Sequence, residues 1–198
     1  MTVAAASGRT NQKKRTRRHL LDAAARLMAQ GRKPTLEDVA EEALVSRATV
    51  YRYFPSAETL LAEVALDLAV PQAETLFADD KSSDPVARLE RADAALDEMI
   101  YDNEMALRAF LIQAVQQRME GGDVETRQNR RTPLIDAALA PAKREFTPAS
   151  YAMLRRAMGL VIGTEAMIAF KDVLGLDEAE ARKVKRWMIR ALVEAARK

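Results

Sequence analysis

The sequence predicts an all-α fold, and three observations support this prediction. Apolar residues recur at helical spacing along the 198-residue chain, and no segment shows the alternation typical of a β-strand. Seven glycines and seven prolines are too few for a disordered or low-complexity chain, and 48% of the residues are hydrophobic. We expect three parts: a basic flexible arm over residues 1–15, a small helical domain over 16–62 and a larger helical domain over 63–198.

The first helix is predicted over residues 17–30, where apolar residues recur at helical spacing until Gly31 ends the pattern. A second short helix begins after Thr35, because Thr35 and Asp38 stand at the spacing of a capping box. Its apolar stripe ends at about Ala43, so this helix spans only about two turns.

A third short helix is predicted over residues 47–53, with Ser46 as its N-cap and Pro55 just beyond its end. Val50 and Phe54 point inward in this helix, while its Arg, Thr and Tyr side chains can face solvent. Two short helices joined by a tight turn, with a basic segment before them, have the layout of a helix-turn-helix motif.

The remainder of the chain is also predicted to be helical. Residues 57–78 continue as a connecting helix that Pro71 kinks or ends, and residues 79–85 form a loop. The later helices are expected over residues 85–102, 103–119, 124–140, 148–171 and 178–197.

The net charge of +2 hides an uneven distribution along the chain. Residues 1–60 hold 11 Lys/Arg and 6 Asp/Glu, giving +5, whereas residues 61–198 hold 20 and 23, giving −3. Six basic residues precede Asp22, the first acidic one. Such a basic run is either a solvated tail or a nucleic-acid contact.

The segment from Thr35 to Leu61, TLEDVAEEALVSRATVYRYFPSAETLL, resembles the DNA-binding domain of the tetracycline-repressor (TetR) family of transcriptional regulators. Its most specific part is Val45-Ser46-x-x-Thr49-Val50-Tyr51-Arg52-Tyr53-Phe54-Pro55-Ser56-x-Glu58-x-Leu60. With the first helix, the resemblance covers about residues 15–65. It implies an N-terminal helix-turn-helix DNA-binding domain and a C-terminal helical ligand-binding and dimerisation domain. It also implies a homodimeric repressor that binds a palindromic double-stranded DNA operator and is released by a small-molecule effector.

Two residues depart from the family pattern. Leu44 stands in the turn where the family usually has a glycine, and a positive φ there would cost a leucine about 1–2 kcal/mol unless the turn changes shape. Ala57 replaces a lysine that commonly holds a DNA phosphate in the family.

The resemblance places the third helix in the major groove. Arg47 and Arg52 can then each reach a guanine, or Arg52 a phosphate, and Thr49 can touch a thymine methyl group. The small side chain of Ala48 lets the helix approach, and Thr35, Ser46, Tyr51 and Tyr53 match family positions that hold phosphates. The expected DNA-binding residues are Arg17, Arg18, Thr35, Ser46, Arg47, Ala48, Thr49, Tyr51, Arg52 and Tyr53.

Other roles are open for some of these residues. The arginines can be ordinary surface charge, and the tyrosines can be packing residues that expose only a hydroxyl group. The acidic residues Glu37, Glu41 and Glu42 of the second helix are expected to face away from the duplex, because carboxylates facing it would argue against DNA binding.

The last two helices are expected to form a dimer interface. An exposed apolar stripe favours association, and the resemblance implies a four-helix bundle across a two-fold axis. The expected interface residues are Gly159, Ile162, Gly163, Val184, Trp187, Met188 and Ala191. The alternative is that they form the core of a monomer.

The middle helices are expected to enclose an effector pocket, on the resemblance and because flexible methionines suit irregular cavities. The candidate ligand-binding residues are Met99, Met105, Phe110, Gln113, Met153, Glu165 and Met167. Plain core packing is the alternative for each. For Glu165, an internal hydrogen bond or an interface salt bridge is an equally good explanation.

The composition argues against several other classes of protein. The chain has no Cys and a single histidine, His19, and its scattered carboxylates form no metal-spaced set, so we expect no catalytic residue, metal or cofactor. It lacks a transmembrane or signal segment, which predicts a cytoplasmic protein that does not insert into membranes. The alternatives left open are a helical scaffold, a membrane-surface protein and an activator of the same fold.

Overall fold

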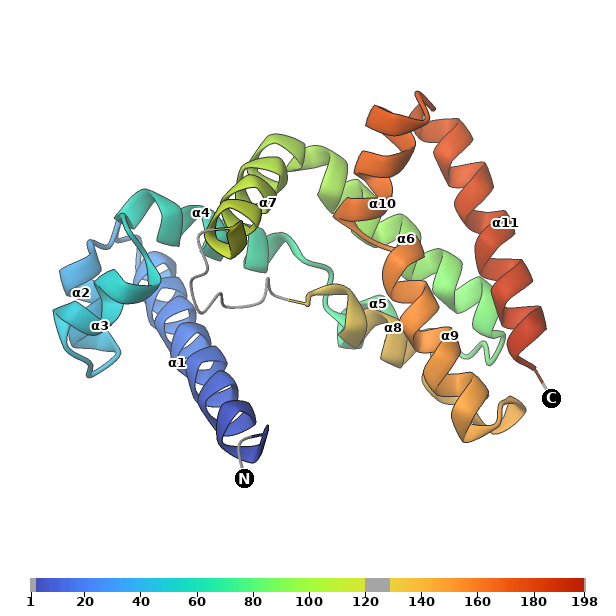
Figure 1. The fold of residues 1–198 in the computed structure, drawn as a ribbon, viewed down its shortest axis with the longest axis horizontal. Coiled ribbons are helices and arrows are strands. Elements are labelled where there is room, and N and C mark those ends of the chain that lie inside the picture. The colour runs from blue at the N-terminus through green and yellow to red at the C-terminus, as the bar shows by residue number, and fades with distance from the viewer. Residues whose placement is uncertain (1–2, 120–128, 198) are drawn as a thin grey trace. The chain divides into compact units, whose positions relative to one another are not determined.

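The computed structural model describes residues 3–119 and 129–197, and at residues 3–11, 14 and 117 it describes the backbone alone. Within these ranges the chain is helical and has no strand, in agreement with the predicted all-α fold (Figure 1). The chain divides into two compact units. Unit 1 comprises residues 1–69 and 111–127, and unit 2 comprises residues 70–110 and 128–198.

Helix α1 spans Val3–Ala29 and is longer than predicted. The expected flexible arm over residues 1–15 is, from Val3 onward, the first part of this helix. The physical reason is local: Ala4, Ala5 and Ala6 have the highest helix propensity, and no proline occurs before Pro34. The basic residues that precede Asp22 therefore lie on a helix.

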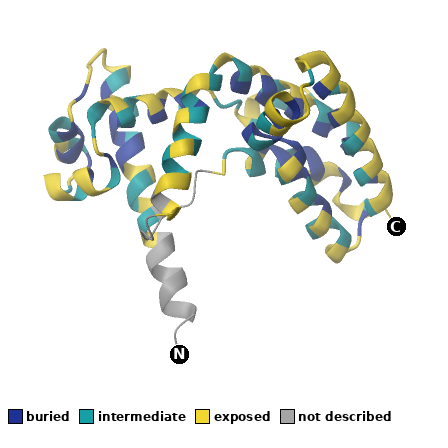
Figure 2. Ribbon diagram, turned by 45° about the horizontal axis from the view of Figure 1, so that its top comes forward, coloured by how far each residue is buried: buried dark blue, intermediate teal, exposed yellow. Residues whose placement is uncertain are grey.

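Three further helices complete the helical core of unit 1: α2 (Leu36–Glu42), α3 (Arg47–Tyr53) and α4 (Ala57–Ala69). The bounds of α2 and α3 agree with the sequence prediction. Their inner faces share one buried cluster with α1, to which α3 contributes Val50 and its C-cap Phe54, both fully buried (Figure 2). Ala57 packs against this cluster at the start of α4, so the family's lysine position is a packing position here.

The connecting helix ends before Pro71, and a short helix α5 (Ala73–Leu76) follows. The expected domain boundary after residue 62 therefore falls inside α4, whereas the compact units separate after Ala69. The long helices α6 (Pro85–Asp102) and α7 (Glu104–Met119) agree with prediction, and Asp84 caps α6 by accepting from two backbone N–H groups.

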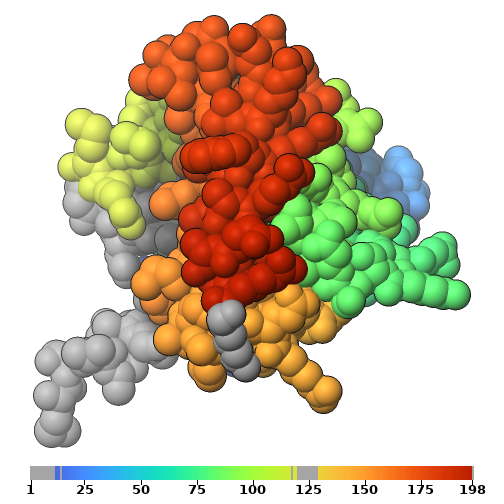
Figure 3. Space-filling view, turned by 90° about the vertical axis from the view of Figure 1, so that its right-hand side faces the viewer, coloured from blue at the N-terminus to red at the C-terminus, as the bar shows by residue number. Residues whose placement is uncertain are grey.

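The C-terminal elements of unit 2 are more broken than predicted. They are α8 (Arg131–Leu139), a 3-10 turn (Ala140–Glu145), α9 (Pro148–Val161), α10 (Thr164–Ile168), a π-helical turn (Ala169–Val173) and α11 (Glu178–Ala196). The predicted start of α8 at residue 124 lies outside the described residues. Figure 3 shows α11 in red down one face of unit 2, with α6 in green beside it.

The predicted helix over residues 148–171 is interrupted at Ile162 and Gly163. Gly163 has φ +135°, a conformation that strongly favours glycine. A β-carbon there would lie 2.6 Å from the guanidinium carbon of Arg131. The Arg131 side chain bonds to the carbonyl of Gly159 and pairs with Glu165, so it occupies the break between α9 and α10.

Candidate nucleic-acid interface

The turn between α2 and α3 keeps the shape that glycine favours, although Leu44 occupies it. Leu44 has φ +53°, its N–H donates to the Glu41 carbonyl at 3.1 Å, and the Val45 N–H donates to the Ala40 carbonyl at 3.0 Å. These are the two bonds of a Schellman motif. The Leu44 side chain is 93% exposed, so no packing offsets the cost of its backbone conformation.

We predict that Leu44→Gly stabilises the protein by about 1 kcal/mol, since glycine adopts a positive φ without steric strain. Urea unfolding followed by circular dichroism measures this change. Glu41→Gly is the control, because it places glycine in a right-handed helix and is expected to cost about 1 kcal/mol. A loss of stability in both variants would contradict the strain argument.

Helix α3 presents one solvent-exposed face with two adjacent rows. Arg47 and Tyr51 form one row at i, i+4 spacing, and Ala48 and Arg52 form the other. All four side chains are exposed, whereas Val50 behind them is fully buried. The face therefore offers two guanidinium groups on either side of a small residue.

The other two expected contacts on α3 are half-buried. Thr49 lies near the start of the helix, and its hydroxyl group is 2.9 Å from that of Ser46. Tyr53 packs against the buried cluster of unit 1, and the guanidinium of Arg52 lies 5.4 Å from the centre of its ring. Tyr53 thus has a packing role as well as an accessible edge.

Arg17 was expected at the DNA, but its guanidinium is engaged inside unit 1. It donates to the Glu63 carboxylate and to the Tyr53 carbonyl at 3.1 Å, and it lies 4.4 Å from the centre of the Phe54 ring. Glu63 is buried, and this arginine supplies a counter-ion to its carboxylate. Arg17 therefore joins α1 to the end of α3 and to α4.

Arg18 is the more accessible of the two arginines. Its side chain is 62% exposed and forms ion pairs with Asp22 at 2.9 Å and with Asp67 at 3.6 Å. Exposed pairs of this kind are weak, so a DNA phosphate can compete for the guanidinium.

The hydroxyl groups expected to hold phosphates are used within the motif. The Thr35 hydroxyl oxygen accepts from the Asp38 N–H at 3.1 Å, and the Thr35 backbone N–H donates to the Asp38 carboxylate at 2.8 Å, which completes the predicted capping box. The Thr35 hydroxyl group also donates to this carboxylate at 2.8 Å. Ser46 accepts from the Thr49 N–H at 3.2 Å as the N-cap of α3. Asp38 also gives the start of α2 a negative charge. Thr35 is a cap whose donors are already used by Asp38, so it offers no spare donor to a phosphate.

Tyr51 donates its hydroxyl hydrogen to Glu37 of α2, with 2.9 Å between the two oxygens. This bond lowers the pKa of the Glu37 carboxyl and raises the pKa of the Tyr51 hydroxyl. Arg47 lies near enough to affect both groups electrostatically. Glu37 was expected to face away from the duplex, and its carboxylate lies instead beside the exposed face of α3.

The other two acidic residues of α2 have different surroundings. Glu42 accepts a hydrogen bond from Arg26 of α1 at 2.8 Å, which holds it on the side of α2 that meets α1. Glu41 is exposed and has no hydrogen bond or ion pair from its side chain to any residue in the described ranges. Sequence reasoning treated the three carboxylates alike, and the contact of Glu37 with α3 becomes visible only when the two helices are packed.

The expected dimer residues fall into two groups. Ile162 is fully buried and Gly163 lies against Arg131, so both belong to the interior of one protomer and cannot meet a partner. On α11, Trp187 is 70% exposed and lies one turn from the exposed Val184 and Ala191, with Met188 half-buried beside it. Gly159 on α9 has open space where a β-carbon would be.

The expected ligand residues have different surroundings within the described part of the chain. Met99 and Met167 are buried in unit 2, Met105 and Met153 are 78% and 67% exposed, and Glu165 pairs with Arg131. Phe110 and Gln113 are half-buried on α7. The internal hydrogen bond considered for Glu165 is thus present, with Arg131 as its donor, and buried methionines behave as packing residues.

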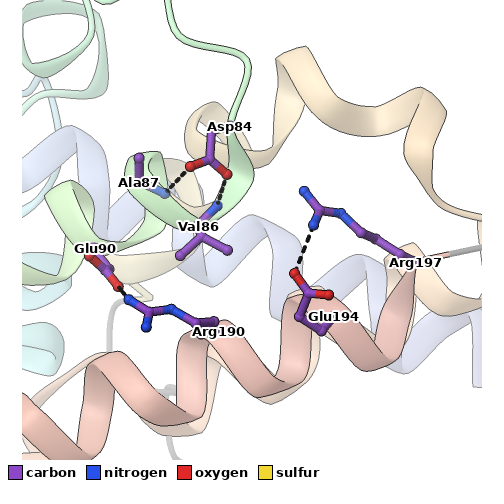
Figure 4. Close-up of a pocket in the computed structure, with 7 residues that line it drawn as sticks. All are labelled: Asp84, Val86, Ala87, Glu90, Arg190, Glu194 and Arg197. Carbon is purple, nitrogen blue, oxygen red and sulfur yellow. Dashed lines mark hydrogen bonds and ion pairs between the residues drawn. The ribbon is translucent and has the colours of Figure 1, made fainter.

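A surface pocket of about 380 Å³ lies elsewhere, between the start of α6 and the end of α11 (Figure 4). Its lining residues are Asp84, Val86, Ala87, Glu90, Arg190, Glu194 and Arg197. Each charged group already has a protein partner: Asp84 caps α6, Glu90 pairs with Arg190, and Arg197 donates to Glu194. The charged groups of the lining would have to give up these partners to bind a ligand.

Two features of the described residues bear on the other classes of function. Across residues 3–119 and 129–197, no cluster of three or more His, Cys, Asp or Glu side chains has the arrangement of a metal site. None of the helices within these ranges is both long and apolar enough to cross a membrane. His19 is exposed on α1.

Comparison with known proteins identifies one part of the chain. Residues 20–64 match a family model described as bacterial regulatory proteins, tetR family. The match starts inside α1, covers α2, the turn and α3, and ends inside α4. No curated protein and no solved structure matches the chain. The matched residues are those that build the exposed face described above.

Proposed function

We propose that this chain, which matches the tetR family of bacterial regulatory proteins over residues 20–64, is a DNA-binding repressor that binds a palindromic operator as a homodimer. The observation that carries the proposal is the exposed face of α3, where Arg47 and Arg52 flank Ala48. A guanidinium group can donate two hydrogen bonds to the O6 and N7 atoms of a guanine in the major groove. The small residue between them lets the helix enter the groove.

The proposed dimer rests on the apolar surface of α11. Large apolar side chains in contiguous exposed patches mark association surfaces, and a tryptophan that is 70% exposed is unusual in a monomer. Trp187 lies beside Val184, Met188 and Ala191, while Leu160 on the neighbouring helix α9 is 77% exposed. A two-fold axis through this surface would bury the same residues of both protomers.

We extend the proposal to release by a small-molecule effector, as the family resemblance implies. Such an effector must bind the DNA-competent and DNA-incompetent forms with different affinities, because equal binding shifts nothing. A coupling of about 1–3 kcal/mol, typical of such systems, changes operator affinity roughly 5- to 150-fold.

Selection of random duplex DNA by the purified protein tests the proposed function. A homodimer is expected to enrich a palindrome whose half-sites are separated by about one helical turn of DNA. Binding should also weaken steeply with salt, because phosphate contacts release counterions. Enrichment of no sequence would overturn the proposal.

Arg47→Ala is predicted to relax the base preference at one position of each half-site. The expected loss of discrimination there is about 1–3 kcal/mol, the contribution of one good bidentate contact. Fluorescence anisotropy on the selected operator and its single-base variants measures it. Tyr53→Phe is the comparison, because loss of a phosphate contact weakens binding to all sequences alike. If Arg47→Ala weakens every variant equally, Arg47 does not read a base.

A further inference from the structure

Glu37 is an acidic residue beside a surface that otherwise presents positive charge. It is the second residue of α2, and the Tyr51 hydroxyl donates to it from α3 at 2.9 Å. Arg47 is the cation of α3 that acts on this pair electrostatically. The carboxylate of α2 therefore lies beside the row of α3 that holds Arg47 and Tyr51.

A carboxylate in this position discriminates between DNA groups by its chemistry. An ionised carboxylate accepts hydrogen bonds and donates none. Both the hydrogen bond from Tyr51 and the position of Glu37 near the start of a helix favour the ionised form. It is repelled by phosphates and by the O6 and N7 acceptors of guanine. Cytosine offers the N4 amino donor in the major groove, and no acceptor of its own lies next to it there, whereas the adenine amino group adjoins the N7 acceptor.

We propose that Glu37 is a specificity-determining residue, which accepts a hydrogen bond from the amino group of one cytosine in each operator half-site. The inference rests on the proposed DNA-binding function and extends it to α2. Tyr51 is then a positioning residue, since its hydroxyl holds the carboxylate beside α3. The same negative charge weakens binding to DNA that lacks the cytosine, because an unpaired carboxylate near phosphates is unfavourable.

Glu37→Gln tests the proposal, with Glu41→Gln as the matched control. Both variants remove one negative charge from α2 with little change of shape, but only Glu37 contacts α3. Random-duplex selection comes first, followed by anisotropy titrations at one fixed salt concentration. The DNAs are the selected operator, its single-base variants and an unrelated duplex.

The wild type and Glu41→Gln are expected to lose at least about fivefold in affinity when the cytosine is replaced, which is the lower end of one good base contact. Glu37→Gln should lose this cytosine preference and bind the unrelated duplex more tightly than Glu41→Gln does. Tyr51→Phe keeps the ring but removes the donor, and it should give a cytosine preference between those of the wild type and Glu37→Gln.

Two results separate the failure of this inference from the failure of the proposed function. If the wild type enriches a palindrome and Glu37→Gln keeps the same base preferences as Glu41→Gln, the role of Glu37 is wrong while DNA reading stands. If the wild type enriches no sequence, the proposed function fails and this inference fails with it. Thermal unfolding of each variant shows whether it is folded at the assay temperature.

Discussion

Lys185→Met is expected to lower the free energy of unfolding by about 3–5 kcal/mol near neutral pH, because it leaves buried carboxylates without a counter-ion. Lys185 on α11 is 2% exposed, and its ammonium nitrogen lies 2.5 Å from Asp93 Oδ1 and 2.7 Å from Asp97 Oδ1 of α6. The two aspartates are one turn apart and are themselves buried. Urea unfolding of the full chain measures the loss.

Lys183→Met is the control for this prediction, since Lys183 is an exposed residue of the same helix. A surface change of this kind is expected to stay within about 0.5 kcal/mol. Adding Asp97→Asn to Lys185→Met should recover part of the stability by removing one uncompensated charge. If Lys185→Met costs no more than Lys183→Met, the cluster does not hold α6 against α11.

The second large effect concerns pH and the carboxyl group of Asp93. Burial raises its pKa from 3.8 to about 6, the adjacent charge of Asp97 adds to this rise, and the positive charges of Lys185 and Arg182 oppose it. Because the pKa of Asp93 is raised in the folded state, its protonated form stabilises the fold, and this contribution is complete below pH 4. The contribution is lost as the pH rises through about 6. The loss from this one group is about 3 kcal/mol, at 1.4 kcal/mol for each unit of pKa.

Asp93→Asn removes this titration, so its stability relative to the wild type should increase between pH 4 and pH 7. The difference between the two unfolding free energies at each pH removes the contribution of distant titrating groups and reports Asp93 together with the charges beside it. Glu98→Gln, which removes an exposed carboxyl from the same helix, is the control for the loss of a charge from α6. A difference for Asp93→Asn that stays flat with pH would show that burial does not raise the pKa of Asp93.

These two predictions bear on the proposed function through α11. The Lys185 side of this helix packs against α6, and the side with Trp187 carries the proposed dimer surface. Loss of the buried cluster therefore disturbs the element that would bring two DNA-binding domains together. We expect its variants to weaken operator binding without changing the preferred bases.

The helix-turn-helix motif was predictable because its signals are local. Thr35 with Asp38, Ser46, and Pro55 set the ends of α2 and α3 through contacts within a few residues, and the structure has the same ends. The turn was harder to predict, since the sequence does not show whether Leu44 keeps a positive φ. The Schellman bonds to Glu41 and Ala40 hold it there.

Contacts between residues far apart in the chain could not be predicted in this way. Arg17 looked like one more cation of a basic arm, but its partner Glu63 is 46 positions away. Lys185 meets Asp97 at a separation of 88 positions. Each lies on the apolar face of its own helix, but local spacing does not show that the two residues pair. The break at Gly163 likewise depends on Arg131, which comes from another helix.

The all-α class, the helix-turn-helix motif and the outward face of α3 could be predicted from the residues alone, because helix caps and apolar periodicity follow from neighbours within a few positions. Which charges remain available could not be predicted in this way. In the folded chain Arg17 pairs with Glu63, Ile162 is buried, and Glu37 accepts a hydrogen bond from Tyr51. The reason is that a charge in a folded protein pairs with its spatial neighbours, and helix packing sets those neighbours.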